Sequence, residues 1–293
     1  MTKKNKIFWI VSWPKSGNTL LRAITASLFF TEDGKLEDFS IFTNTINQFE
    51  KIERLNFIKK ENPEDYKNIS KIEILSKYWL DMQSKGLNIS GDFCFLKTHS
   101  ALLSMYNNQF TNKQNTMGFF YIVRDPRDVA ISYAKHLNVD IDTSIKRMIS
   151  SETCFEYPGI KDLNNKISPL GIQSSWGIHL KSWQMFEVPN LVIKYEDIVY
   201  KKEVVLKKII NFFKNHFNIK FSNISNKIEN IINTTSFENM SKLENKMGFK
   251  ESVQNKNFFQ VGKKLQWEKK LQLPQIKLIE KHFKKEMNDL GYL

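Results

Sequence analysis

Short runs of apolar residues recur along the chain, and polar turns separate them from longer stretches with helical periodicity. The strand-like runs are rich in aromatic or β-branched residues and cover Phe8 to Val11, Phe93 to Leu96, Phe119 to Val123 and Leu191 to Ile193. Each precedes a polar turn and a helical pattern. Short continuous apolar strands between helices indicate a parallel sheet covered on both faces. We therefore predict an α/β protein with a central parallel sheet flanked by helices.

The rest of the chain divides into two packing helices and two irregular stretches. Apolar residues recur at helical spacing from Glu203 to Phe217 and from Gln275 to Leu290. Residues 31–75 and 139–173 carry Asn, Ser, Pro and Gly with scattered aromatics, which favours irregular or short-helical excursions. These could wall a substrate pocket or be simple surface insertions. No repeat or linker divides the chain, so we predict one domain over residues 1–293.

The first polar loop, "WPKSGNT", follows the first strand and opens a helix. Its successive backbone N–H groups and the helix start can point at one anion, in the region where open α/β sheets bind ligands. Lys15 adds a positive charge, Gly17 lets the backbone approach closely, and the hydroxyls of Ser16 and Thr19 can donate to phosphate oxygens. An ordinary strand-to-helix turn with a surface lysine is the alternative. Because the lysine precedes the glycine, the loop differs from the Walker A pattern, which disfavours a Mg²⁺-dependent nucleoside triphosphatase.

The second loop, "IVRDPRDVAISY", again leads from a strand into a helix. Asp125 suits the N-cap, a proline follows at N1, and Asp128 falls at N3 of a start that resembles a capping box. Arg124 leaves the strand and can hold a phosphate bidentately, while Ser132 on the same helix can add a hydrogen bond. Alternatively, Arg124 or Arg127 simply pairs with one of the two aspartates.

The third loop, in "GDFCFLKTHS", places Lys97 and His99 after a strand. The two side chains point the same way if the extended geometry continues. A histidine beside a lysine can act as a base while the lysine neutralises developing charge. A lone histidine is more often structural, but this one shares a sheet edge with the two phosphate-type loops. The other histidines, which have no such position, are His136, His179, His216 and His282.

Composition and charge narrow the class of protein. The 293 residues are 41% hydrophobic, enough for a substantial core, and the formal net charge is +13. This excess favours anionic partners such as phosphorylated cofactors, nucleic acid, acidic glycans or membrane surfaces, or it is only a lysine-coated surface. Cys94 and Cys154 have no metal-like spacing, so we expect inert thiols in a reducing compartment. The N-terminal apolar stretch is too short for a signal sequence and no later stretch has membrane-spanning length, which predicts a cytoplasmic protein.

Seven stretches in order along the chain resemble the cytosolic sulfotransferase family: "WPKSGNT", "KTH", "IVRDPRDVAISY", "SSWGIHLKSW", "LVIKYEDI", "TTSFENM" and "MNDLGYL". Members of this family use 3′-phosphoadenosine 5′-phosphosulfate (PAPS) as the sulfuryl donor. The resemblance covers essentially the whole chain. It implies the sulfotransferase fold, which is similar to that of P-loop-containing nucleotide hydrolases. It also implies a small-molecule acceptor with a hydroxyl or, less expected, an amine, and neither a metal, a nucleic acid nor a membrane as partner.

The resemblance also implies roles for particular residues. The first loop would hold the 5′-phosphosulfate through Lys15, Ser16, Gly17, Asn18 and Thr19. The 3′-phosphate would be bound by Arg124 and Ser132, and the adenine would lie near Tyr195, Thr235 and Phe237, although Phe237 could equally be core. In an in-line transfer, His99 would take the acceptor's proton, Lys15 would stabilise the leaving oxygen, and Lys97 would hold the sulfuryl oxygens.

The chain departs from the family in two places. The usual C-terminal phosphate loop resembles Arg-Lys-Gly, whereas here Gln260 and Val261 precede Gly262; Lys263 or Lys264 could restore the charge. Leu20 stands where many members have a tryptophan, which removes one stacking face for the adenine. The altered C-terminal loop leaves an inactive relative open as an alternative. A nucleotide-dependent kinase of related loop architecture and a non-catalytic basic binder, which the net charge of +13 suggests, also stay open.

The acceptor and the oligomeric state are not determined by these patterns. Aromatic residues near the predicted mouth of the site could line a pocket for an alcohol or phenol, or could equally be core. They are Tyr78, Trp79, Phe93, Phe155 and Tyr157.

Overall fold

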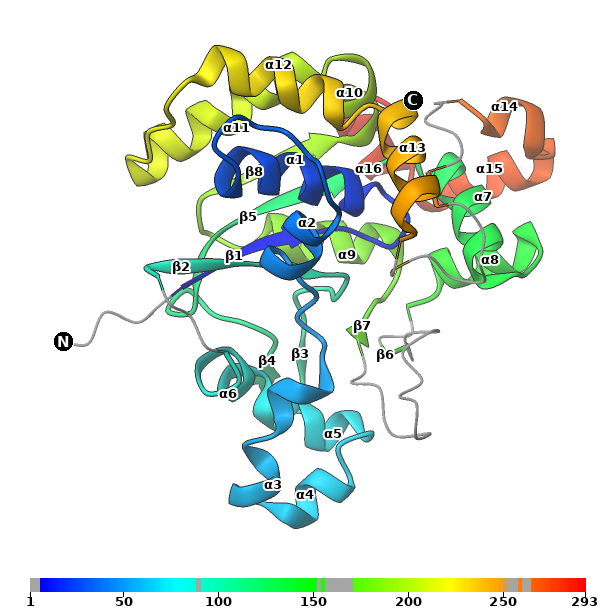
Figure 1. Cartoon of the computed structure of the whole chain (residues 1–293). Helices are drawn as coiled ribbons and strands as arrows, with labels where there is room; N and C mark the ends of the chain where they lie inside the picture. Colours follow the sequence, from blue (N-terminus) through cyan, green and yellow to red (C-terminus); the bar gives the residue numbers. More distant parts are fainter. Residues whose placement is uncertain are drawn as a thin grey trace.

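A four-stranded parallel sheet forms the centre of the protein (Figure 1). The computed structural model describes residues 6–87, 91–151, 154–155, 171–249, 251, 258–259 and 265–293. The strand order is β2-β1-β5-β8, and every neighbouring pair is parallel. The strands are β1 (Lys6–Val11), β2 (Phe93–Thr98), β5 (Thr116–Val123) and β8 (Asn190–Lys194). The sheet confirms the predicted fold class, and all four strands overlap the predicted runs.

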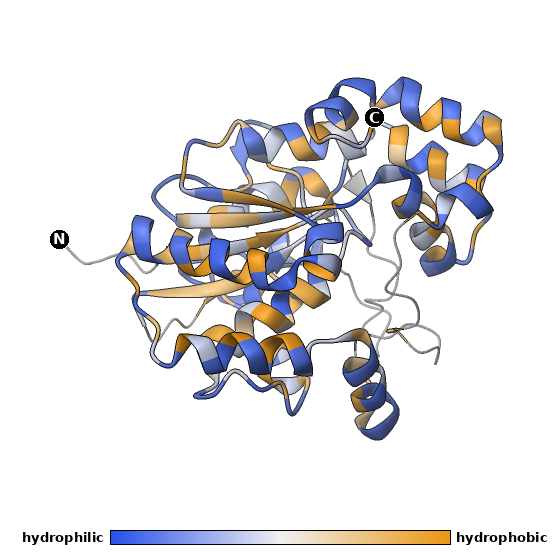
Figure 2. Ribbon diagram, turned by 90° about the horizontal axis from the view of Figure 1, so that it is seen from above, coloured by the Kyte–Doolittle hydropathy of each residue, from blue (hydrophilic) through white to orange (hydrophobic). Residues whose placement is uncertain are grey.

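The central strand β1 sends alternate side chains into two separate cores. Trp9 and its alternate neighbours lie in one buried cluster, whereas Phe8 and Ile10 lie in the other, on the opposite face of the sheet. The Phe8 face is covered by α1 (Asn18–Phe30), α11 (Lys202–Phe217) and α12 (Ile224–Thr234). The Trp9 face is covered by α7 (Pro126–Leu137) and α9 (Trp176–Gln184). Hydrophobic and hydrophilic residues alternate along the helices in Figure 2, as expected for helices with one face on a sheet.

Residues 31–75 form short helices, as their content of Asn, Ser, Pro and Gly predicted. They comprise α2 (Ser40–Thr45), η1 (Ile52–Leu55), α3 (Ile58–Glu61), α4 (Pro63–Lys67) and α5 (Ile72–Leu75). With η2 (Ser76–Tyr78) and α6 (Trp79–Ser84), the later helices form a lobe below the sheet in Figure 1. Their buried apolar side chains join the core on the Trp9 face. In the second predicted excursion, α8 (Ile141–Ile149) is followed by an antiparallel pair, β6 (Cys154–Phe155) and β7 (Gly171–Ile172).

Two local predictions are wrong. No helix follows β2: the chain continues into a small antiparallel hairpin of β3 (Ser104–Met105) and β4 (Asn108–Gln109) before it reaches β5. The stretch from Gln275 to Leu290 is two helices, α15 (Leu273–His282) and α16 (Lys284–Asp289), because the backbone breaks at the buried Phe283. Apolar spacing continues across that break, so the pattern did not reveal it. The remaining helices are α10 (Tyr195–Tyr200), α13 (Phe237–Met247) and α14 (Trp267–Lys270).

Candidate active site

The loop between β1 and α1 turns sharply at the edge of the sheet. Lys15 and Gly17 both have positive φ, 65° and 102°. A Cβ added to Gly17 would lie 2.4 Å from Cδ2 of Tyr195, so only glycine fits there. Within the part of the chain that the structure describes, Ser16 Oγ and Asn18 Oδ1 are buried and have no hydrogen-bond partner. Buried polar atoms are normally satisfied, and two such atoms in one loop indicate a polar ligand.

Three cationic side chains converge beside this loop. Burial, together with the charges of Lys97 and Arg124, lowers the pKa of Lys15 to about 8. Burial also lowers the pKa of Lys97 to about 8, with Arg22 adding to this and Glu251, whose carboxylate lies 3.9 Å from Nζ, opposing it. Bringing like charges together away from water is costly unless an anion compensates them. The electrostatics of this sheet edge therefore favour an anionic ligand.

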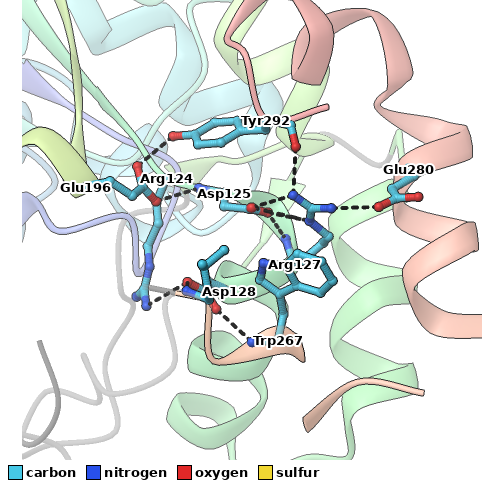
Figure 3. Close-up of polar contacts among 9 residues, drawn as sticks. Arg124, Asp125, Arg127, Asp128, Glu196, Trp267, Glu280 and Tyr292 are labelled. Carbon is cyan, nitrogen blue, oxygen red and sulfur yellow. Dashed lines mark hydrogen bonds and ion pairs between the residues drawn. The ribbon is translucent and has the colours of Figure 1, made fainter. Parts of the chain in front are cut away.

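Arg124, which follows β5, and Arg127, in the first turn of α7, have different surroundings (Figure 3). Arg127 donates to both carboxylate oxygens of Asp125, to Glu280 Oε1 at 2.6 Å and to the carbonyl oxygen of Tyr292 at 2.8 Å. Arg124 is also buried, but its closest carboxylate oxygen, on Asp128, is 3.8 Å away. Among the described residues, nothing accepts a hydrogen bond from Arg124 Nε. The ion-pair alternative thus holds for Arg127, while Arg124 keeps hydrogen-bonding capacity for a ligand.

The helix start at α7 agrees with the prediction only in part. Asp125 is the N-cap and accepts a hydrogen bond from the backbone N–H of Arg127. Asp128 does not complete a capping box, because its carboxylate accepts from the backbone N–H groups of Leu265 and Trp267 instead. Tertiary contacts with the C-terminal segment replace the local bond. Ser132 lies half-buried further along the same helix.

His99 directly follows β2, and hydrogen bonds fix both its ring and its backbone carbonyl. Its Nδ1 lies 2.8 Å from the carbonyl oxygen of Ser12, which only accepts, so Nδ1 carries the proton and Nε2 the basic lone pair. The fully buried His179 donates from Nε2 to the carbonyl oxygen of His99 at 3.0 Å, and its Nδ1 accepts from Tyr121. Burial and the charge of Lys97 hold the pKa of His99 well below its usual value. His99 is therefore neutral at physiological pH, the state a general base needs.

Several polar residues around His99 had no signal in the sequence. Glu50 is buried and accepts hydrogen bonds from Thr98 and Ser100, the two neighbours of His99 along the chain. Burial raises its pKa. These partners are 48 and 50 residues away from Glu50 in sequence, so only the tertiary structure brings them together. The same is true of Arg22, which is fully buried and forms a salt bridge with Glu251.

The residues predicted near an adenine do not all line one cavity. A cavity of about 590 Å³ lies between α1, α10–α11 and the start of α13, and Leu20 and Phe237 are among its lining residues. Thr235 is fully buried, and its hydroxyl donates to the carbonyl oxygen of Ile231. Tyr195 lies beside the phosphate-type loop, with the Arg124 guanidinium 4.6 Å from its ring centroid. The structure thus puts Tyr195 near the predicted phosphate ligands and Phe237 in the cavity wall.

Some predictions fall outside the described residues: Gly262 and Lys263 with their neighbours Gln260, Val261 and Lys264, the side chain of Phe155, and Tyr157. Trp79 is buried in the core rather than lining a mouth. Burial raises the pKa of the Cys94 thiol to about 11, which agrees with an inert cysteine.

Two kinds of feature are absent from the residues that the structure describes. Those residues contain no helix with the length and apolar character needed to cross a membrane. Nor do they bring together three or more His, Cys, Asp or Glu side chains as a metal site would.

Parallel α/β sheets bind ligands beyond the carboxyl ends of their strands, and the cationic side chains at that edge here favour an anionic ligand. The family model for the sulfotransferase domain matches residues 5–291, so the chain belongs to the sulfotransferase domain family. Its fold is similar to that of mouse sulfotransferase SULT7A1 complexed with PAP, at 18% sequence identity and a TM-score of 0.57, over 100% of this chain and 87% of that one. It is also similar to retinol dehydratase in a complex with retinol and PAP, at 19% identity and a TM-score of 0.57, over 97% and 81% of the two chains. No curated protein matches the chain in sequence.

Proposed function

We propose that this sulfotransferase moves a sulfuryl group from PAPS to a hydroxyl group of a small molecule. The observation that carries the proposal is the convergence, at one edge of the sheet, of three cationic side chains with a neutral histidine. We call this group the anion site; it consists of Lys15, Ser16, Lys97, His99 and Arg124. The family membership and the PAP-bound proteins of the same fold support the identity of the donor.

The residues present fit a doubly phosphorylated donor. Ser16 Oγ and Arg124 Nε are buried polar atoms with hydrogen-bonding capacity left over in the described part of the chain. The backbone beside Gly17 is open to close approach because Gly17 has no side chain, and α1 begins there with its first N–H groups. We assign the 5′-phosphosulfate to the loop from Lys15 to Thr19 and the 3′-phosphate to Arg124 and Ser132.

The chemistry follows from the protonation states. The donor supplies an activated sulfuryl group, and the enzyme must position it, balance its charge and remove a proton from the acceptor. His99 Nε2 accepts that proton, while the hydrogen bond from Nδ1 to Ser12 fixes the ring orientation. Lys15 neutralises charge on the leaving phosphate oxygen, and Lys97 donates to the sulfuryl oxygens. A hydroxyl acceptor needs the base more than a neutral amine does, so a hydroxyl is the acceptor that His99 favours.

The test is a calorimetric titration of the purified protein with adenosine 3′,5′-bisphosphate (PAP). ATP and adenosine 5′-phosphate serve as controls for the position of the phosphates. We expect binding that requires the 3′-phosphate, followed by transfer of label from PAPS in a screen of hydroxyl acceptors. Equal binding of ATP in the presence of Mg²⁺ would instead favour a nucleotide-dependent kinase. No binding of PAP would reject the donor site.

A further inference from the structure

Lys202 links two helices. It is the first residue of α11, and its ammonium lies at the C-terminal end of α12, whose C-cap is Thr235 and where a cation is favourable. Its Nζ donates to the carbonyl oxygen of Thr235 at 2.7 Å and lies 3.1 Å from Thr235 Oγ1. Burial lowers the pKa of Lys202 to about 8. Lys202 is thus a half-buried cation whose ammonium is held in place by Thr235.

Lys202 also lines the 590 Å³ cavity that contains Leu20 and Phe237. This volume is within the usual range for small-molecule pockets. Leu20 follows the phosphate-type loop by one residue, so the cavity opens next to the loop that we assign to the 5′-phosphosulfate. Leu20, Val199 and Phe237 supply apolar walls for a flat ring, and Lys202 and Ser236 supply polar groups. The cavity therefore has the composition of a nucleobase pocket.

The lysine changes which hydrogen bonds this pocket can offer. Thr235 is fully buried and is not among the cavity-lining residues, and its carbonyl and hydroxyl oxygens both accept from Lys202 Nζ. An ammonium has three N–H groups, and Thr235 takes two of them. The third N–H is left for a ligand, and Lys202 is among the residues that line the cavity. A base must therefore place an acceptor there, and the ring nitrogens of a purine are such acceptors.

We propose that Lys202 is a specificity-determining residue that donates a hydrogen bond to a ring nitrogen of the donor's purine base. This inference rests on the proposed function, since it assumes that a purine nucleotide binds with its phosphates at the anion site. The family resemblance implied that Thr235 lies near the adenine, but its hydroxyl donates inside the fold to the carbonyl oxygen of Ile231. The role of Thr235 is then to hold the ammonium in place.

The experiment is a double-mutant cycle between the protein and the ligand. PAP and its 1-deaza, 3-deaza and 7-deaza analogues are titrated calorimetrically into wild-type protein and Lys202→Met. We expect wild type to bind one of the analogues about 10- to 100-fold more weakly than it binds PAP, as for the loss of a charged hydrogen bond. Lys202→Met should bind that analogue and PAP with equal affinity. Lys202→Arg, which keeps a donor, should retain a preference for PAP. Lys208→Met removes an exposed charge further along α11, at a residue that is not among those lining the cavity, and should bind every ligand as wild type does.

The outcomes separate the two proposals. Tight binding of PAP that requires the 3′-phosphate, with no deaza analogue distinguished by Lys202→Met, would overturn the role of Lys202 and leave the donor site intact. A loss of thermal stability in Lys202→Met with unchanged relative affinities would likewise show that the lysine only caps α12. Failure of PAP to bind wild type at all would reject both proposals.

Discussion

Two buried arginines, three residues apart where β5 leads into α7, have opposite surroundings. Arg127 lies in what we call the paired cluster, which consists of Asp125, Arg127, Glu196, Glu280 and Tyr292. There every charged group has a partner, and Tyr292 ties the C-terminal residues to the cluster through Glu196. Arg124, in the anion site, has a carboxylate 3.8 Å away, a long hydrogen bond of 3.4 Å to the carbonyl oxygen of Lys15, and an Nε without a partner among the described residues. Charged groups whose hydrogen bonds are all made within the protein stabilise the fold, whereas those with unused hydrogen-bonding capacity are available to a ligand.

The largest effect that we expect is on turnover, and it comes from a residue outside the paired cluster that should contribute little to donor binding. His99→Ala should lower turnover of a hydroxyl acceptor by about 10²- to 10⁴-fold, because it removes the positioned base. Binding of PAP and the thermal midpoint should change little. Turnover is measured by transfer of label from PAPS, and binding by calorimetry. Turnover like that of wild type would remove His99 from the mechanism.

Breaking the paired cluster should affect stability rather than binding. Arg127→Ala leaves the buried Asp125 carboxylate without its main partner, which should lower the free energy of unfolding by about 3–5 kcal/mol. The measurement is urea denaturation followed by fluorescence. The protein that remains folded should bind PAP as wild type does. An unfolding free energy that does not change would show that the cluster contributes no stability.

The matched change in the anion site should have the opposite signature. Arg124→Ala should weaken PAP by about 1.5–3 kcal/mol, the range for a charged hydrogen bond, while stability changes little. Adenosine 5′-phosphosulfate, which lacks the 3′-phosphate, should bind the variant and wild type alike. Equal losses for both ligands would reject Arg124 as the residue that recognises the 3′-phosphate. Ser132→Ala is the milder companion variant.

The smallest effect concerns pH. The pKa of Lys15 and that of Lys97 are lowered to about 8 in the ligand-free protein, and an anion binds to their protonated forms. Affinity for PAP should therefore be constant between pH 7 and pH 8, and above pH 8 it should fall by about tenfold per pH unit for each of the two lysines that takes up a proton on binding. Lys15→Arg keeps its charge and should flatten this decline. An affinity that does not depend on pH between 7 and 9.5 would contradict the proposed protonation states.

The strand–loop–helix units could be predicted because neighbouring residues in the sequence determine them. The order strand, polar loop, helix depends on neighbouring residues, so the units around Lys15 and Arg124 were predicted with correct element types. Parallel strands end at one edge, which brings their loops together whatever lies between them in sequence. The break at Phe283 and the hairpin after β2 were missed because an apolar pattern does not specify where the backbone turns.

The sequence by itself therefore determined the class of fold, the family and the group of residues at the sheet edge. Only the tertiary structure decided which arginine is paired, that Asp128 binds the backbone at Leu265 and Trp267, and that Lys202 lies on Thr235. Except for the local Arg127–Asp125 pair, these contacts join residues from 33 to 165 positions apart. Their existence depends on how helices pack on the sheet. Local propensity determines which helix or strand a residue belongs to, but packing decides whether its charge already has a partner. In this protein, the charged residues without a full set of partners are the ones that we assign to the donor, and the fully paired ones hold the fold.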